Sequence, residues 1–326
     1  MGIINFGIIG PGKIANRLAS SFEHAKGGKV YAVASRDEAK AKEFATTYKI
    51  EKIYNSYEAL VKDPAVDVIY IATPHPFHFD QTLLCLKNGK AVLCEKPLAL
   101  NYRQVSEMID TARTNNVFLM EAMWSRFFPA TKKVVELIQS GTMGEVKYLS
   151  ADFGFAAPYD LNNRVYNMTL GGGAQLDVGV YPMFLALLLL GKPDEVKALS
   201  KLATTGADET TAALLSYKNG SMAHILSSIV TDSPKQADIM GTKGRIIMQT
   251  PWHKSQQITM KLNSGETEEF SFPYPGNGFQ YQVEEVIACL NTGKKESDLM
   301  PHSLSLLMAR VSDEIRKQGG IKYSVD

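Results

Sequence analysis

The first 122 residues alternate short apolar segments with amphipathic segments of helical period, and this alternation constrains the fold most. The apolar, strand-like segments cover residues 3–9, 30–35, 66–72, 91–95 and 117–121. The helical patterns between them cover residues 14–24, 38–48, 79–88 and 102–115. Strands that alternate with helices pair in parallel, because each crossover helix returns the chain to the same end of the sheet. We therefore predict an α/β, doubly wound parallel sheet, which in its complete form has six strands, one more than these five patterns show.

Beyond about Pro129 the pattern changes, and strand-like segments dominate. A helical stretch at 131–139 leads to a strand at 146–155, and an apolar helix covers 177–190. Seven further strand patterns follow, at residues 196–203, 210–217, 222–228, 237–241, 245–249, 257–262 and 268–272. Helical patterns at 280–290 and 304–317 close the sequence. Asn-Gly, Lys-Gly and Ser-Gly turn signals between the strands favour a large open, mostly antiparallel sheet in an α+β domain.

Length and charge limit the possible functions. A chain of 326 residues is long enough for two cores, and we place the domain boundary between residues 122 and 123. We leave open that a C-terminal helix packs back on the first domain. The 35 basic and 34 acidic residues give no stripe for nucleic acid, which favours a small-molecule partner.

Three cysteines and one apolar run bear on the compartment. Cys85, Cys94 and Cys289 lie far apart and lack CxxC spacing, so we expect neither disulfides nor a metal site. The longest apolar run, residues 183–190, is far shorter than the ~20 residues that span a membrane, and no secretory signal is evident. We expect a cytoplasmic protein without a membrane partner.

A glycine-rich turn follows the first predicted strand and precedes the first predicted helix. Its sequence, Gly10-Pro11-Gly12-Lys13-Ile14-Ala15, matches the GxGxxG/A pattern in the context that the pattern requires. The first glycine permits a tight turn, the second lets the backbone approach a pyrophosphate, and the phosphates meet free N–H groups of the helix. An ordinary strand-to-helix turn is the alternative, and dinucleotide binding is the better interpretation.

The second strand ends in Ser35-Arg36 rather than in the acidic residue typical of NAD sites. Arg36 could pair with a 2′-phosphate and cover the adenine, with Ser35 donating another hydrogen bond. This favours NADP(H), with NAD(H) still possible because the adjacent Asp37 could face the ribose. A solvated loop arginine is the other alternative.

Lys96 directly follows the strand 91–95, at the carboxyl end where open α/β sheets bind their ligands. There it could hydrogen-bond a reacting hydroxyl or carbonyl, or lower the pKa of a neighbouring acid. Glu95-Lys96-Pro97 is a weak motif by itself, and a solvated lysine is the alternative.

A glycine triplet, residues 171–173, runs into the apolar helix that carries Asp177 and Tyr181. The two residues are spaced i, i+4 and are expected on one helix face, where the glycines would let the backbone approach a ligand closely. Tyrosine's pKa of about 10 is too high for proton transfer at neutral pH unless a cation such as Lys96 lowers it. Alternatively, Asp177 caps the helix and Tyr181 is a core residue.

Taken together, these segments resemble the glucose-fructose oxidoreductase, inositol dehydrogenase and rhizopine-catabolism (Gfo/Idh/MocA) family over essentially the whole chain. The segments that carry the resemblance are GIIGPGKIA at the start, Ile71-Ala72-Thr73-Pro74 with His78, Glu95-Lys96-Pro97, and Gly171 to Pro182. Residues 121–127, EAMWSRF, and GGGAQLDVGVYP are most similar to the branch of dimeric dihydrodiol dehydrogenases and NADP-dependent D-xylose dehydrogenases. Many family members carry histidine where this chain has Tyr181.

The resemblance implies an NADP-dependent alcohol or sugar dehydrogenase. It places Lys96 and Tyr181 at catalytic positions with Asp177 beside them, and it implies a homodimer built through the C-terminal sheet. Residues 1–122 would bind the cofactor, and residues 123–326 would bind substrate and dimerise. By position, four further residues are expected beside the cofactor, together with Glu95: Thr73, Pro74, His75 and His78. Either histidine could equally be a loop or helix-cap residue.

Three residues are expected on the substrate side. Trp124 and Arg126 follow the last strand of the first domain, where an aromatic wall and a fixed cation suit a polyhydroxyl substrate. Arg164, in the loop before the glycine triplet, could project to the same place. Each could equally be an anchor of the domain interface.

The mechanism that we expect is hydride exchange at a carbinol carbon of a sugar, polyol or dihydrodiol. Tyr181 exchanges the hydroxyl proton, Lys96 stabilises the tyrosinate or alkoxide, and Asp177 orients the pair. In a second version Lys96 is itself the acid/base and Tyr181 positions the substrate. The rival from another class is a cofactor-sensing regulatory protein of the same fold without catalysis.

Overall fold

A computed structural model describes residues 2–160 and 163–326, which divide into two compact units. The first unit consists of residues 1–99, 103–127 and 274–305, and the second of residues 100–102, 128–273 and 306–326. The segment 274–305 thus belongs to the first unit although it follows the second sheet in the sequence. The domain boundary after residue 122 stays a prediction.

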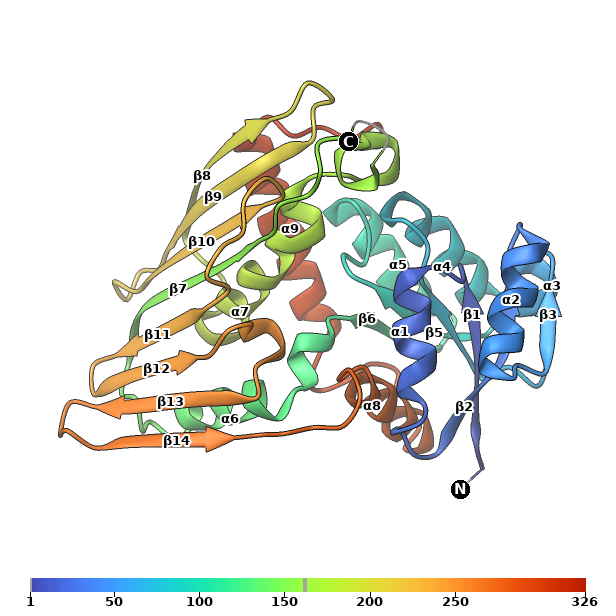
Figure 1. Cartoon of the computed structure of the whole chain (residues 1–326), viewed down its shortest axis with the longest axis horizontal. Coiled ribbons are helices and arrows are strands. Elements are labelled where there is room, and N and C mark those ends of the chain that lie inside the picture. The colour runs from blue at the N-terminus through green and yellow to red at the C-terminus, as the bar shows by residue number, and fades with distance from the viewer. Residues whose placement is uncertain (1, 161–162) are drawn as a thin grey trace. The chain divides into compact units, whose positions relative to one another are not determined.

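The first unit is built on a six-stranded parallel sheet (Figure 1). Its strands are β1 (Ile4–Ile9), β2 (Gly28–Ala34), β3 (Lys52–Tyr54), β4 (Val68–Ile71), β5 (Ala91–Glu95) and β6 (Leu119–Ala122). They lie in the order β3-β2-β1-β4-β5-β6, so the direction of winding reverses between β1 and β4. This order confirms the predicted doubly wound sheet and puts its switch point at the carboxyl ends of β1 and β4.

The helices of this region follow the predicted amphipathic segments closely. They are α1 (Lys13–Ser21), α2 (Glu38–Tyr48), α3 (Tyr57–Val61), α4 (His78–Lys87), α5 (Tyr102–Thr114) and, from the later segment, α8 (Gln280–Asn291). Asp37 begins α2 by accepting a hydrogen bond from the Lys40 backbone N–H, and Ser56 begins α3 in the same way. Strand β3 and helix α3 were not predicted, because three and five residues are too few to show a period.

The second unit is built on an eight-stranded sheet, β14-β13-β12-β11-β7-β10-β9-β8. Its strands are β7 (Val146–Gly154), β8 (Glu195–Leu202), β9 (Asp208–Ser216), β10 (Met222–Ser228), β11 (Ala237–Gly241), β12 (Gly244–Met248), β13 (Gln257–Leu262) and β14 (Thr267–Ser271). Only β7 and β10 pair in parallel; the other pairs in this sheet are antiparallel. The predicted open, mostly antiparallel sheet is confirmed.

Helices cover one face of this sheet. They are α6 (Pro129–Gln139), α7 (Val180–Leu190) and α9 (His302–Gly319), of which residues 306–319 belong to this unit. Ser227 on β10 faces Gly179 just before α7, and Ser200 on β8 faces Gly319 at the end of α9. Ser227 lies opposite Thr211 in the strand pairing, and the hydroxyls of Thr211 and Ser200 form a hydrogen bond. The three side chains therefore point to the same face of the sheet, and α7 and α9 both lie on that face.

The helical stretch Met168–Leu190 is, among the described residues, long and apolar enough to cross a membrane by length and composition alone. However, 83% of its apolar window is buried inside the protein. It is a core helix of the second unit, as predicted for its apolar part.

The first unit contains a carboxyl group that is fully buried behind the strand ends. Glu121 on β6 is 3% exposed and accepts a hydrogen bond from the Leu98 backbone N–H at 3.0 Å. Its second oxygen has no hydrogen-bond partner among the described residues. Burial raises the pKa of Glu121 to about 7, partly offset by a hydrogen bond with Ser305.

This buried carboxyl makes stability depend on pH in a defined direction. The unfolded chain ionises Glu121 near pH 4.5 and the folded chain near pH 7, so its contribution to stability is present below pH 4.5 and is lost as the pH rises toward 7. Glu121→Gln should therefore gain stability over the parent between pH 4.5 and 8, by about 3 kcal/mol at most. Urea unfolding across this range measures it. The exposed Glu43→Gln serves as control, and a pH-independent difference would contradict the prediction.

Candidate functional site

In the first unit, the glycine turn joins β1 to α1 as the motif requires. Gly10 has a φ of +86°, and a Cβ there would lie 2.7 Å from Cγ2 of Thr73, so only glycine fits. At Gly12, by contrast, a Cβ would meet nothing within 4 Å, and α1 has no side-chain N-cap. The first turn of α1, beginning with Lys13 and Ile14, therefore presents backbone N–H groups beside open space, as phosphate binding requires.

Three residues that bear on cofactor preference directly follow β2: Ser35, Arg36 and Asp37. The Asp37 side chain caps α2 and forms an ion pair with Lys40, so its carboxylate is already engaged. Ser35 is buried, and its hydroxyl oxygen accepts from the Asp37 N–H at 3.1 Å. Arg36 is exposed, and its guanidinium lies 5.8 Å from the ring centroid of Phe77. Of the two charges, the arginine is the one available to a ligand.

The segment after β4 lies directly against the glycine turn. Thr73 contacts Gly10 and donates a hydrogen bond to Gln81 at 2.7 Å. Pro74 precedes a short 3-10 helix, His75–Phe77, in which the His75 ring is buried and lies edge-on to the ring of His78. Thr73, Pro74 and His75 thus follow β4 at the switch point, and their contact with the cofactor stays a prediction.

His78 has a different position from the one expected of a cofactor contact. Its ring is fully buried, with Nδ1 2.9 Å from the Pro97 carbonyl oxygen and Nε2 2.8 Å from that of Thr73. Burial lowers the pKa of His78, whereas the two carbonyl oxygens favour its protonated form. The ring therefore ties the Thr73 turn to the loop that contains Lys96. Direct cofactor contact by His78 stays a prediction.

Lys96 follows β5 at the carboxyl edge of the sheet, half-buried and joined to Pro97 by a cis peptide bond. The preceding Glu95 is 5% exposed; it accepts a hydrogen bond from the Tyr70 hydroxyl and another from the Lys96 backbone N–H. Burial raises the pKa of Glu95 to about 7, while the Tyr70 hydrogen bond and the charge of Lys96 oppose that shift. Glu95 thus holds the backbone at Lys96 in place through buried hydrogen bonds.

The two substrate-side candidates of this unit are buried. The Trp124 ring stacks on Phe279 with centroids 4.6 Å apart, and Arg126 donates from Nε to the Leu299 carbonyl at 2.8 Å. Both contacts join the end of β6 to the segment 274–305. Substrate binding by either residue stays a prediction.

In the second unit, the glycine triplet is packed by the chain itself. A Cβ at Gly172 would lie 2.7 Å from the Arg164 carbonyl oxygen, and one at Gly173 would lie 2.2 Å from Oδ1 of Asp208. The expectation that these glycines let a ligand approach the backbone is therefore wrong at Gly172 and Gly173. They are glycines because neighbouring atoms of the protein occupy the space of a side chain.

The helix after the triplet begins irregularly. Gln175–Gly179 is a π-helical turn that continues as α7, whereas a regular helix was predicted. A Cβ at Gly179 would lie 2.6 Å from Oε1 of Gln175 and 2.9 Å from Oγ of Ser227, so the wider turn packs tightly on β10. π-Turns within helices occur frequently at functional sites.

Asp177 lies in this π-turn and does not cap the helix. Its Oδ1 accepts from Nη2 of Arg164 at 2.9 Å, and the side chains of the two are 12% and 40% exposed, respectively. The backbone N–H of Gln175 is instead capped by Asp208. The structure thus brings together Arg164 and Asp177, which were predicted separately, as a half-exposed ion pair.

Tyr181 is buried in an aromatic group that the sequence did not predict. Its ring centroid lies 5.3 Å from that of Phe153 and 5.5 Å from that of His253, and these two stack on each other at 4.3 Å. Phe153 lies within the predicted strand 146–155, but no periodic signal pointed to His253. Its position follows from the neighbouring Trp252, whose indole N–H donates to the Asp152 carbonyl.

Within residues 2–160 and 163–326, no three or more His, Cys, Asp and Glu side chains gather as metal ligands. The chemistry available in the described part of the chain is therefore that of Lys96 and Glu95 in the first unit, and of Tyr181, Asp177, Arg164 and His253 in the second.

Two family models and several relatives match this chain. Residues 4–123 match the model described as oxidoreductase family, NAD-binding Rossmann fold, and residues 131–247 match the Gfo/Idh/MocA C-terminal domain. Trans-1,2-dihydrobenzene-1,2-diol dehydrogenase of Xenopus tropicalis is 41% identical over 98% of both chains. The enzyme of that name from Mus musculus is 39% identical over 99% of both.

A solved structure matches the fold as well as the sequence. It is a 3-ketoreductase from Actinomadura kijaniata in complex with NADP and TDP-benzene, which is 26% identical over 98% of both chains with a TM-score of 0.87. The family models, the relatives and the glycine turn agree. The chain belongs to the NAD(P)-binding Gfo/Idh/MocA family of oxidoreductases.

Proposed function

We propose that this chain is an NADP(H)-dependent dehydrogenase that acts on the CH–OH group of a sugar, polyol or dihydrodiol. One observation carries the proposal: the uncapped start of α1, with open space at Gly12, lies at the same sheet edge as Lys96. The dihydrodiol dehydrogenases and the NADP-bound 3-ketoreductase among its relatives support the reaction and the cofactor.

The residues present fit a nicotinamide dinucleotide. The turn at Gly10 to Ile14 would hold the pyrophosphate, and Ser35 with Arg36 would hold the 2′-phosphate. When bound, the nicotinamide supplies or accepts a hydride. Residues Thr73 to His75 would border the nicotinamide. His78 would hold this segment through its hydrogen bond with the Thr73 carbonyl, and Glu95 would hold the neighbouring backbone at Lys96.

The proton is handled by side chains of this chain. Tyr181 exchanges the proton of the substrate hydroxyl, Lys96 stabilises the tyrosinate or alkoxide, and Asp177, held by Arg164, orients the reacting hydroxyl. In a second version Lys96 exchanges the proton and Tyr181 positions the substrate. The partly exposed ring of Phe153 beside Tyr181 would offer a flat apolar surface to a sugar or dihydrodiol ring.

The decisive experiment replaces Lys96 and Tyr181 separately in the whole protein. A screen of aldoses, polyols and trans-dihydrodiols, followed by NADPH absorbance in both directions, first identifies a substrate. Lys96→Met and Tyr181→Phe should each lower kcat by about 10²–10⁴-fold, the usual loss for a group in proton transfer. Lys62→Met at an exposed position after α3 and Tyr217→Phe at a half-buried position after β9 serve as controls.

The pH profiles of the two variants separate the two versions of the mechanism, because only loss of the acid/base removes its limb from the profile. Near-normal turnover in both variants would refute the assignment. Tight NADP binding without turnover on the whole panel would favour the cofactor-sensing alternative.

Cofactor preference depends on Arg36. Arg36→Ala should raise KM for NADP about thirtyfold, because it removes one charged hydrogen-bonding pair with the 2′-phosphate. KM for NAD should stay within about twofold, because NAD has no 2′-phosphate and Asp37 is already engaged as the cap of α2. Steady-state kinetics with both cofactors test this. Equal changes for NADP and NAD would show that Arg36 does not bind the 2′-phosphate.

We also propose a homodimer through the uncovered face of the second sheet. Four exposed apolar side chains lie on this face on adjacent strands: Leu199, Leu214, Met222 and Tyr148. Exposed apolar side chains gathered on one sheet face are typical of an interface, and a second copy is the occupant that we propose.

Three buried free thiols support a cytoplasmic location.

Leu199→Lys should therefore convert the dimer to a monomer, because Leu199 is 81% exposed and a lysine there would be buried without a partner in the dimer. Sedimentation equilibrium at micromolar concentration measures the mass. Ile53→Lys, at an exposed apolar position of β3, is the control. A dimer that survives Leu199→Lys would count against this face.

A further inference from the structure

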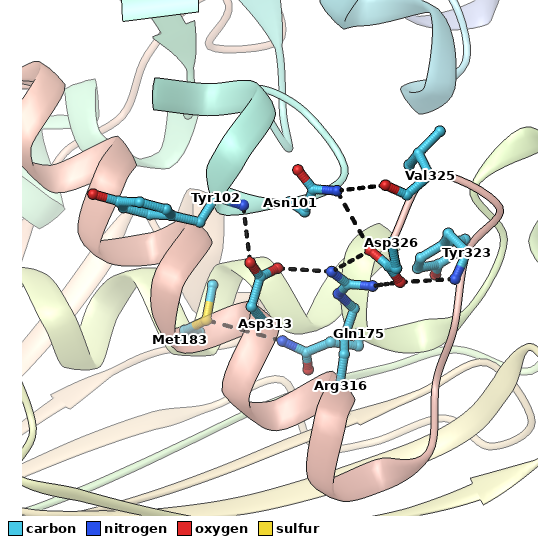
Figure 2. Close-up of polar contacts among 9 residues, drawn as sticks. All are labelled: Asn101, Tyr102, Gln175, Met183, Asp313, Arg316, Tyr323, Val325 and Asp326. Carbon is cyan, nitrogen blue, oxygen red and sulfur yellow. Dashed lines mark hydrogen bonds and ion pairs between the residues drawn. The ribbon is translucent and has the colours of Figure 1, made fainter. Parts of the chain in front are cut away.

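Within the second unit, residues near the end of α9 and beyond it form a buried polar cluster centred on Arg316 (Figure 2). Arg316 is 3% exposed. Its Nη1 donates to Oδ2 of Asp326 at 2.6 Å, while Nη2 donates to Oδ1 of Asp326 at 3.1 Å and to Asp313 at 2.7 Å. A guanidinium held by two carboxylates in this way has a fixed orientation.

The two carboxylates connect this arginine to other segments. Asp313 accepts from the Tyr102 backbone N–H at 2.9 Å, and Asp326 accepts from the Tyr323 backbone N–H at 2.8 Å. Asn101 donates to the Val325 carbonyl and to Asp326 (Figure 2). The loop 320–326 is thereby hydrogen-bonded to Arg316 of α9 and to Asn101.

Tyr323 is the residue that this loop holds in place. It is 5% exposed, packs with Leu100, Leu176 and Ile321, and lies with its ring 5.2 Å from the guanidinium of Arg316. Its hydroxyl donates to the Gly172 carbonyl at 2.7 Å. Burial raises the pKa of Tyr323, so the hydroxyl keeps its proton and remains a donor.

Asp208 holds the other side of the glycine triplet. Its Oδ2 accepts from the Gln175 backbone N–H at 2.8 Å and from the Thr211 hydroxyl at 2.7 Å, while Oδ1 lies against Gly173. Gly173 has a φ of +122°, a conformation open to glycine alone. The triplet is thus fixed between Tyr323 and Asp208, immediately before the π-turn.

We propose that residues 313–326 form a clasp that positions the π-turn, with Tyr323 as a positioning residue for Asp177 and Tyr181. The hydroxyl of Tyr323 fixes the carbonyl five residues before Asp177, and its ring contacts Leu176, the neighbour of Asp177. This inference rests on the proposed function in so far as Asp177 and Tyr181 act on the substrate. The competing possibility is that the clasp only stabilises the fold.

The test compares Tyr323→Phe with Tyr217→Phe in the whole protein. Both substitutions remove a tyrosine hydroxyl that donates to a glycine carbonyl, but Tyr217 donates to Gly191, after the far end of α7. Two measurements are made on each: steady-state kinetics, and hydrogen exchange of the backbone amides in residues 171–181.

In Tyr323→Phe, the loss of one buried hydrogen bond should lower kcat about tenfold and speed amide exchange in 171–181 about tenfold, with KM for NADP unchanged. Tyr217→Phe should change neither. Asp326→Ala should reproduce both changes of Tyr323→Phe, because it releases the Tyr323 N–H and Arg316 together.

Parent-like exchange and kcat in Tyr323→Phe would overturn the proposal. So would an equal loss in Tyr217→Phe, since that would show general destabilisation. If the parent protein turned over no substrate, the proposed function would fail, while the exchange measurement would still decide whether the clasp holds the π-turn.

Discussion

Parallel pairing of β1, β4 and β5 is the constraint on which the positions of the candidate residues in the first unit depend. Ile9 pairs with Ile71, and Ile71 pairs with Cys94, so the three strands end at the same level. Gly10, Thr73 and Lys96 follow these ends and must share one edge of the sheet. The carboxyl groups behind that edge are consequences of the same geometry, because burial between strands raises the pKa of Glu95 and of Glu121.

The second unit positions its candidate site residues in another way. Its sheet is antiparallel apart from one strand pair, so no common strand edge collects the side chains. Instead a helix begins irregularly against the sheet, and its first turn is fixed by a carboxylate from β9, Asp208. Burial raises the pKa of Asp208 to about 6, opposed by hydrogen bonds from Thr211 and Gln175. A buried charge at the start of a helix is favoured by the helix dipole.

The sequence predicted what local periodicity and chain order determine. Five of the six strands of the first sheet, the strands β8 to β14 and the turn at Gly10 all follow from patterns a few residues long. The sequence did not predict what depends on residues far apart. Phe153 and His253 are 100 residues apart, and their stacking could not be read from either segment. The cluster at Arg316 joins residues 101–102 to residues 313–326. A pattern within either short segment does not indicate which distant residues its side chains contact.

The two glycine motifs show why a sequence pattern can predict the position of a turn correctly and its role in ligand binding wrongly. At Gly12 the space of a side chain is open, while at Gly172 and Gly173 atoms of the protein occupy it. In a sequence both positions are simply glycines before a helix. The difference depends on what packs there, which is the backbone of residues 164–167 at Gly172 and the side chains of Asp208 and Tyr323 at Gly173. The sequence therefore predicts the turn, and the packing around each glycine decides whether a ligand or the protein itself occupies the space of the missing side chain.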